Sequence, residues 1–95
     1  MVSKRLTARV VRDYGLSAGT VLRRLDGLTL LFAKDKDAAW LERIQAAIVL
    51  AAGPDSDRLE RMAALAEIDW RDVLVAAGLA NEDWRDRVTD ALGPA

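Results

Sequence analysis

Residues 37–53 read DAAWLERIQAAIVLAAG, and this stretch decides the fold. Asp35 or Asp37 begins a helical pattern, and Gly53 followed by Pro54 ends it. Beyond Gln45 the run AAIVLAA contains no polar side chain on any face. A helix that is apolar all round is typical of the buried centre of a bundle. We therefore expect a central buried helix over 37–52.

The segments on either side of this helix also have helical patterns. Lys4–Tyr14 carries apolar residues at helical spacing and ends at Gly15, and Ser17 can cap a second short helix reaching about Leu25. Downstream, Ser56 is the expected N-cap of the next helix. The sequence predicts one all-α domain over 1–95, a compact orthogonal bundle of about five to six short helices around the central helix.

The tetrapeptide DWRD occurs twice, at 69–72 and at 83–86. We expect Asp69 and Asp83 to be N-caps, with Asp72 and Asp86 three residues later in the manner of a capping box. Each repeat then begins a helix. The expected core consists of apolar residues from all of these helices: Val10, Leu25, Trp40, Leu41, Ile44, Ile48, Leu65, Ile68, Trp70, Leu74 and Leu79.

The stretch LTLLFA, 28–33, is ambiguous. Its Thr and Phe favour a strand, but no partner strand is evident elsewhere, and a lone strand cannot satisfy its own hydrogen bonds. We interpret it as the end of a helix or a third short helix, with a strand at the edge of an oligomer as the alternative.

Composition argues against most catalytic chemistry. The chain contains no His and no Cys, the commonest general base, transition-metal ligand and thiol nucleophile. We expect no enzyme activity, no cofactor and no metal. A small carboxylate-dependent enzyme is the least favoured alternative, and its candidates are the four carboxylates of the DWRD repeats, which have a simpler use as helix caps: Asp69, Asp72, Asp83 and Asp86.

Charge is unevenly distributed along the chain. Residues 1–36 contain eight Lys or Arg and three Asp, a net charge of +5, whereas residues 37–95 contain six and twelve, a net charge of −6. This asymmetry indicates either a basic binding surface or attraction between the two halves, within one fold or between protomers. The longest apolar run is far shorter than a membrane span, and no secretory signal is evident, so we expect a cytoplasmic protein without membrane contact.

The segment Thr7–Asp26, with its motif GLSAGTV at 15–21, resembles the turn and recognition helix of bacterial helix-turn-helix repressors. The resemblance implies a helix in the major groove of DNA. The side chains facing the bases would be Ser17, Ala18, Gly19, Leu22 and Arg23. Of these only Arg23 can form a bidentate hydrogen bond to a base, and Arg24 stands where the family usually has an apolar residue.

A second resemblance covers Arg43 to Trp84 and centres on DWRDVLVAAGLA. This block is similar to a group of small uncharacterised bacterial all-helical proteins. It implies a compact helical cytoplasmic protein and no particular activity.

The favoured function is a non-catalytic protein-interaction or regulatory module. A protein partner or self-association is expected ahead of nucleic acid, and a helix-turn-helix DNA-binding regulator is the main alternative. The candidate interaction surface combines the basic residues of the N-terminal hairpin with a tryptophan expected to be either core or partly exposed: Lys4, Arg5, Arg9, Arg12, Arg23, Arg24 and Trp84.

Overall fold

The computed structural model describes residues 2–30 and 37–94, and within these ranges every regular element is a helix. The predicted all-α class is therefore confirmed. The N-terminal pair of helices is joined by a short 3-10 turn, and three further helices follow. In chain order the elements are α1 (Lys4–Tyr14), η1 (Gly15–Ser17), α2 (Ala18–Asp26), α3 (Ala38–Ala52), α4 (Ser56–Ala77) and α5 (Trp84–Leu92).

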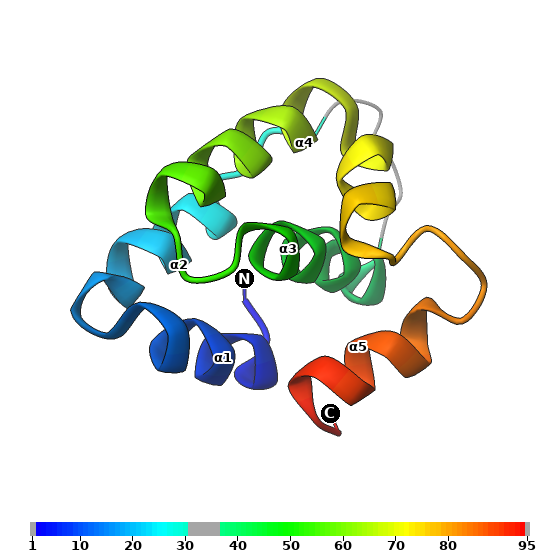
Figure 1. Ribbon diagram of the computed structural model, residues 1–95, viewed down its shortest axis with the longest axis horizontal. Helices are drawn as coiled ribbons and strands as arrows, with labels where there is room; N and C mark the ends of the chain where they lie inside the picture. Colours follow the sequence, from blue (N-terminus) through cyan, green and yellow to red (C-terminus); the bar gives the residue numbers. More distant parts are fainter. Residues whose placement is uncertain (1, 31–36, 95) are drawn as a thin grey trace.

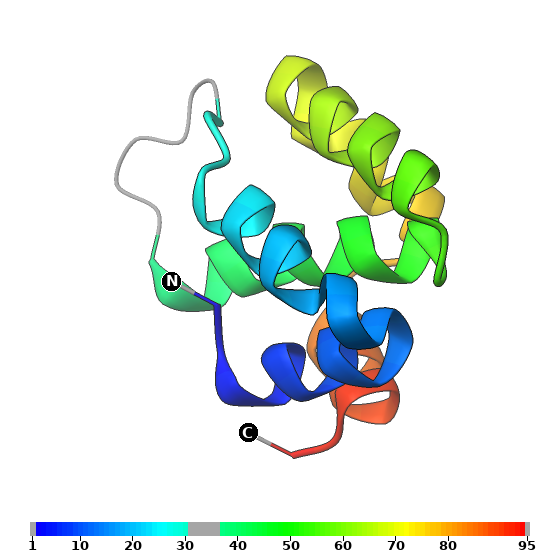
Figure 2. The same ribbon diagram turned by 90° about the vertical axis from the view of Figure 1, so that its left-hand side faces the viewer.

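Helix α3 lies between α4 on one side and α1 and α5 on the other (Figures 1 and 2). Its most extensive packing contact is with α4. The radius of gyration of 11.9 Å is close to the value of about 12 Å expected of a compact chain of this length.

The apolar run of α3 contributes to a core that all five described α-helices share. Ile44, Ile48 and Val49 have no exposed surface, and they pack among residues from every other α-helix. Those partners include Leu6 and Val10 of α1, Leu25 of α2, Ala63 and Val73 of α4 and Val88 of α5. Of the apolar run 46–52, only Leu50 and Ala51 are half-buried and the other residues are buried, which accounts for the absence of polar side chains.

Two helix starts show how the local sequence fixes the boundaries. The Asp37 side chain accepts a hydrogen bond from the Trp40 amide at 2.9 Å and caps α3. Helix α4 is capped by Asp55, whose Oδ1 accepts from the amides of Asp57 and Arg58. The prediction of Ser56 as the cap was wrong, because Asp55 has the extended backbone of an N-cap and its carboxylate reaches two amides at once.

The first DWRD repeat lies at a kink inside α4 and starts the second of its two helical parts, as the sequence predicts. Asp69 has non-helical backbone angles (φ −151°, ψ 96°), and its Oδ1 accepts from the Arg71 amide at 3.1 Å, as an N-cap would. The chain turns sharply at this position (Figure 1). At the second repeat Asp83 precedes α5, but its side chain makes no capping bond and accepts from Arg87 Nε at 2.8 Å. Asp83 therefore occupies the predicted N-cap position of α5, but the capping hydrogen bond expected from its side chain is not formed.

Six of the eleven predicted core residues are buried: Val10, Leu25, Ile44, Ile48, Leu74 and Leu79. Trp40, Leu41, Leu65 and Trp70 are half-buried, and the two tryptophan rings make an edge-to-face contact with centroids 5.3 Å apart. Ile68 was a wrong assignment, since 76% of it is exposed. The buried line of α4 runs through Leu59, Ala63 and Ala66, and Ile68 lies about 200° around the helix from Ala66.

Residues 28–30 follow α2 without helical structure, so the helix predicted there was wrong for these three positions. The rest of the LTLLFA stretch lies outside the described residues.

Candidate functional site

The basic N-terminal hairpin consists of α1, η1 and α2. Gly15 adopts a positive φ of 53°, which allows the chain to leave α1 and enter the turn. The end of α1 is joined to the C-terminal end of α3, because the Tyr14 hydroxyl donates to the Gly53 carbonyl at 2.6 Å. Leu6, Val10, Val21 and Leu25 anchor the inner face of the hairpin in the core.

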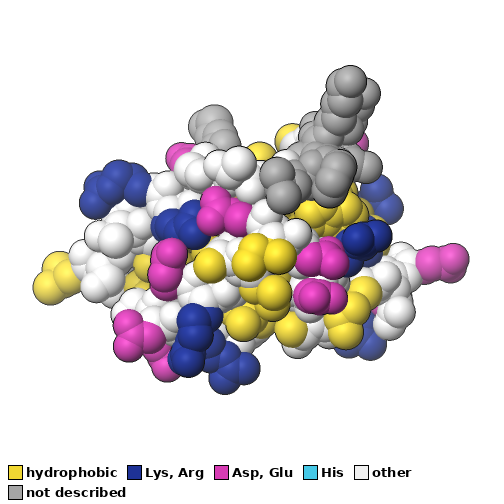
Figure 3. All heavy atoms as spheres, turned by 90° about the horizontal axis from the view of Figure 1, so that it is seen from above, with side chains coloured by type: hydrophobic (Ala, Val, Ile, Leu, Met, Phe, Trp, Pro, Cys, Tyr) yellow, Lys and Arg dark blue, Asp and Glu magenta, His cyan; other side chains and the backbone are white. Residues whose placement is uncertain are grey.

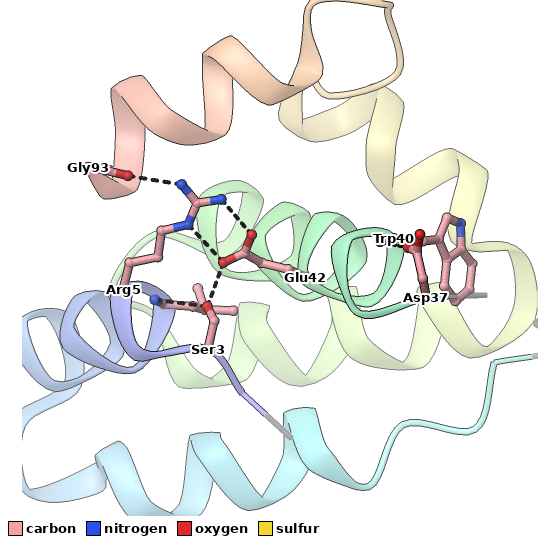
Figure 4. A network of polar contacts seen from close by, with 7 residues as sticks. Ser3, Arg5, Asp37, Trp40, Glu42 and Gly93 are labelled. Carbon is pink, nitrogen blue, oxygen red and sulfur yellow. Dashed lines mark hydrogen bonds and ion pairs between the residues drawn. The ribbon is translucent and has the colours of Figure 1, made fainter. Parts of the chain in front are cut away.

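Arg5 does not face solvent as a free cation. Its guanidinium contacts both carboxylate oxygens of Glu42, with Nη2–Oε1 at 2.6 Å and Nε–Oε2 at 2.8 Å, and donates to the Gly93 carbonyl at 3.0 Å (Figure 4). Ser3 donates its hydroxyl to the same carboxylate. The hydrogen bond from Arg5 is the largest of the effects that lower the pKa of Glu42. Arg5 therefore joins α1, α3 and the C-terminal end of α5.

Arg24 is engaged in a similar way on α2. Its guanidinium forms ion pairs with Glu60 and Glu67 of α4, both at 2.8 Å. Glu67 also accepts from the Thr29 amide at 2.9 Å, and these contacts lower its pKa. Arg9 pairs with Asp13 at 2.8 Å and donates to the Ala91 carbonyl.

Three of the six predicted basic surface residues thus form internal contacts. Arg5 and Arg24 each connect the positively charged N-terminal segment to a carboxylate of the negatively charged remainder. The uneven charge along the chain is explained in part by attraction between the two halves within one fold.

The outer side of the hairpin carries the remaining basic side chains. Lys4 and Arg23 are exposed and form no ion pair within residues 2–30 and 37–94, and the Arg12 side chain is 70% exposed beside Asp13. Two large apolar residues of the same hairpin are also exposed: Val11, 52% exposed, and Leu16, which is fully exposed in η1. We call the exposed side chains Val11, Arg12, Leu16 and Arg23 the hairpin tip; two of them are cationic and two are apolar.

The helix-turn-helix positions are only partly accessible. Ala18, one of the five positions assigned to face the bases, is 6% exposed and packs into the core. Leu22 is half-buried, whereas Ser17, Gly19 and Arg23 are exposed. Arg24, which stands where helix-turn-helix repressors usually have an apolar residue, forms an ion pair with Glu67 of α4.

Trp84 lies far along the chain from the hairpin, at the first residue of α5, and is half-buried against the core. The guanidinium carbon of Arg43 lies 4.8 Å from the ring centroid, and that of Arg85 lies 4.5 Å from it. Arg43 also donates through Nε and Nη2 to the Leu79 carbonyl, at 2.9 and 2.7 Å. Sequence reasoning missed Arg43, because nothing in the helical pattern of α3 indicates a contact 41 positions away.

Figure 3 shows another face of the molecule, seen from above, where hydrophobic side chains gather at the centre between acidic and basic ones. The exposed large apolar residues of α4 are Ile68 and Val75.

A hollow of about 320 Å³ lies between the start of α1 and the start of α3, with mostly apolar walls formed by Val2, Ser3, Lys4, Ala38, Leu41 and Glu42. The Glu42 carboxylate is already held by Arg5 and Ser3.

Two of the four DWRD carboxylates named for the enzyme alternative form local ion pairs, Asp69 with Arg71 and Asp83 with Arg87, and the other two, Asp72 and Asp86, are exposed. Across the described part of the chain, no group of three or more Asp or Glu side chains is placed to hold a metal ion. The helices described there also include none with the length and apolar character needed to cross a membrane.

Comparisons with protein-family models, with curated proteins and with solved structures each found no match to this chain. The two resemblances noted in the sequence therefore remain predictions.

Proposed function

We propose that the protein is a non-catalytic protein-interaction module whose contact surface is the hairpin tip, and that its partner is an acidic protein. The observation that carries this proposal is the combination of a fully exposed Leu16 with Val11 and two exposed arginines on a hairpin anchored in the core. Exposed apolar residues surrounded by cations suit a partner with complementary acidic and apolar groups.

The different surroundings of the hairpin arginines support the proposal that the hairpin tip is the contact surface. Arg5, Arg9 and Arg24 hold the hairpin in place, whereas Arg23 is exposed and Arg12, 70% exposed, pairs only with its chain neighbour Asp13. A rigid surface loses little conformational entropy on binding. We further propose that the orthogonal arrangement around the helix at 37–52 serves as the frame for this surface, and that the protein acts in the cytoplasm.

A site-specific photo-cross-linker tests the surface in cells. We expect a discrete protein adduct when the cross-linking residue replaces Leu16 and none when it replaces Ile68, which is also exposed but lies on α4. Neutralising Arg12 and Arg23 should weaken the Leu16 adduct. Neutralising Arg58 and Arg61, which are exposed on α4, removes the same charge and should leave the Leu16 adduct unchanged. Equal adducts from both positions, or none from Leu16, would contradict the proposal.

Titration with a fluorescent random DNA duplex distinguishes this proposal from the main alternative, a helix-turn-helix DNA-binding regulator. An interaction module for proteins should give no saturable anisotropy change at low salt. Tight binding that weakens steeply with salt and depends on Arg12 and Arg23 would replace the proposal with the DNA-binding alternative.

A further inference from the structure

Two guanidinium groups share the ring of Trp84 at the junction of α3, α5 and the segment that joins α4 to α5. Arg43 comes from α3 and Arg85 from α5, and both guanidinium carbons lie within 5 Å of the ring centroid. The two cations are close enough to repel. Burial and the charge of Arg85 together lower the pKa of Arg43.

The structure compensates neither charge with a carboxylate. Within residues 2–30 and 37–94, Arg43 and Arg85 form no ion pair, and the protein partner of Arg43 is the neutral Leu79 carbonyl. The nearest acidic residues in the chain are engaged elsewhere or exposed. Asp83 pairs with Arg87, and Glu82 and Asp86 are exposed without an ion pair to either arginine.

Arg43 is held so that part of its guanidinium remains available. Nε and Nη2 both donate to Leu79, which leaves Nη1 without a hydrogen-bond partner in the described structure. At the start of α5 the Asp83 carboxylate turns to Arg87 and does not cap the helix, and Asp86 lies in the first turn. Neither carboxylate forms an ion pair with Arg43 or Arg85 in the described structure.

We propose that Arg43 and Arg85, arranged around Trp84, form a binding site for the phosphate group of a small ligand. The site is separate from the hairpin tip, since its residues come from α3 and α5. A phosphate dianion matches two guanidiniums that form no ion pair with the described residues, and its tetrahedral oxygens can accept from donors approaching from different directions. A carboxylate is planar and singly charged, and it pairs best with a single guanidinium.

The indole N–H resonance of Trp84, assigned with a Trp84→Phe variant, provides a direct readout by NMR. Titration with inorganic phosphate and with glycerol 3-phosphate should shift this signal saturably. Acetate at matched ionic strength should not. Equal affinities for the two phosphates would mean that the site recognises the phosphate group alone, and tighter binding of glycerol 3-phosphate would add contacts to the organic part.

Arg85→Gln is the decisive variant because Arg85 is exposed and its loss should leave the fold intact. It should weaken phosphate binding about tenfold or more, the effect of losing one charge-assisted contact. Arg61→Gln removes the same charge from an exposed position on α4 and should leave affinity unchanged. The thermal melt of each variant, recorded alongside, separates loss of binding from loss of structure.

Three results would overturn the site. The first is a Trp84 signal that neither phosphate shifts, the second is a shift with acetate as large as that with phosphate, and the third is an equal loss of affinity in Arg85→Gln and Arg61→Gln. The last result would mean that phosphate responds only to net charge. Each of these outcomes is independent of the cross-linking result at Leu16.

Discussion

Arg24 and Glu67 form a two-point contact between α2 and α4, with Nη2–Oε1 at 2.8 Å and Nη1–Oε2 at 3.3 Å. Both side chains are about three-quarters buried. Such forked contacts between arginine and a carboxylate are stronger and more directional than single exposed pairs. The contact joins the basic segment of the chain to its acidic segment, and it fixes the position of α2 and with it the hairpin tip.

We expect Glu67→Gln to lower the free energy of unfolding by about 1 kcal/mol, because it removes the charge while keeping an acceptor for the Thr29 amide. Glu60 pairs with the same arginine, but its side chain is 61% exposed. Glu60→Gln should therefore change stability by no more than about 0.5 kcal/mol. Urea denaturation compares the two variants. An equal loss from both would show that the buried fork has no special role.

Acid should destabilise the protein through Glu42 and Glu67, whose pKa values are both lowered by ion pairing in the folded state. The unfolded chain binds protons at higher pH than the folded chain does, so this contribution is fully present above the unfolded pKa of about 4.3. It is lost as the pH falls through the lower folded values. Unfolding free energies measured between pH 6 and pH 3 should fall less steeply in the Glu42→Gln, Glu67→Gln double variant.

Glu82→Gln is the matched control for this pH dependence, since Glu82 is exposed and forms no ion pair with the described residues. Its stability should follow the wild-type curve. A double variant that also follows the wild-type curve would contradict the assignment of acid sensitivity to Glu42 and Glu67.

Ile48 and Ile68 form a contrasting pair, since both were expected in the core and only Ile48 is buried. Ile48→Asp places a charge without a partner in the middle of α3 and should abolish the cooperative melt. The smaller change Ile48→Val should cost about 0.5–1.5 kcal/mol. Ile68→Asp should melt close to wild type, and circular dichroism against temperature measures all three. A cooperative melt of Ile48→Asp near the wild-type temperature would contradict the assignment of Ile48 to the core.

The success with Ile48 and the failure with Ile68 have one physical origin. An apolar run on every face of a helix identifies burial without any knowledge of the partner helices, and this sufficed for α3. In α4 the inward line depends on the helical phase and on the break at Asp69. The sequence indicates an N-cap at Asp69, but it does not indicate that the helix continues up to that residue with Ile68 turned outward.

The candidate site was predictable only in outline. The composition of the first 36 residues predicted a basic hairpin. Which of its arginines are engaged depends on long-range ion pairs, such as Arg5 with Glu42 and Arg24 with Glu67, and the sequence does not indicate these partners. Leu16 is exposed because η1 turns away from the core, and the motif around Gly15 carries no sign of that orientation. The pairing of Arg43 with Trp84 has the same long-range character.

Gln45 provides a pH-dependent test of the core, because it is 1% exposed and lies among the apolar residues of α3. Its Nε2 donates to the Leu25 carbonyl at 3.3 Å, while its Oε1 has no hydrogen-bond partner in the described structure. Gln45→Glu keeps the shape but buries a carboxyl group next to a carbonyl. Burial without a cation raises the pKa of such a group in the folded state.

The sign of the effect follows from proton binding. Below pH 4 the new carboxyl group is protonated in both states and costs little. As the pH rises above about 4.3, the unfolded chain releases its proton first, so the folded state loses stability relative to wild type by up to about 1.4 kcal/mol per pH unit. Gln45→Met, which carries no charge, should show a difference from wild type that is constant with pH. Urea denaturation of all three proteins at pH 4, 5.5 and 7 makes the comparison, and a Gln45→Glu penalty that does not grow with pH would show that water reaches this position.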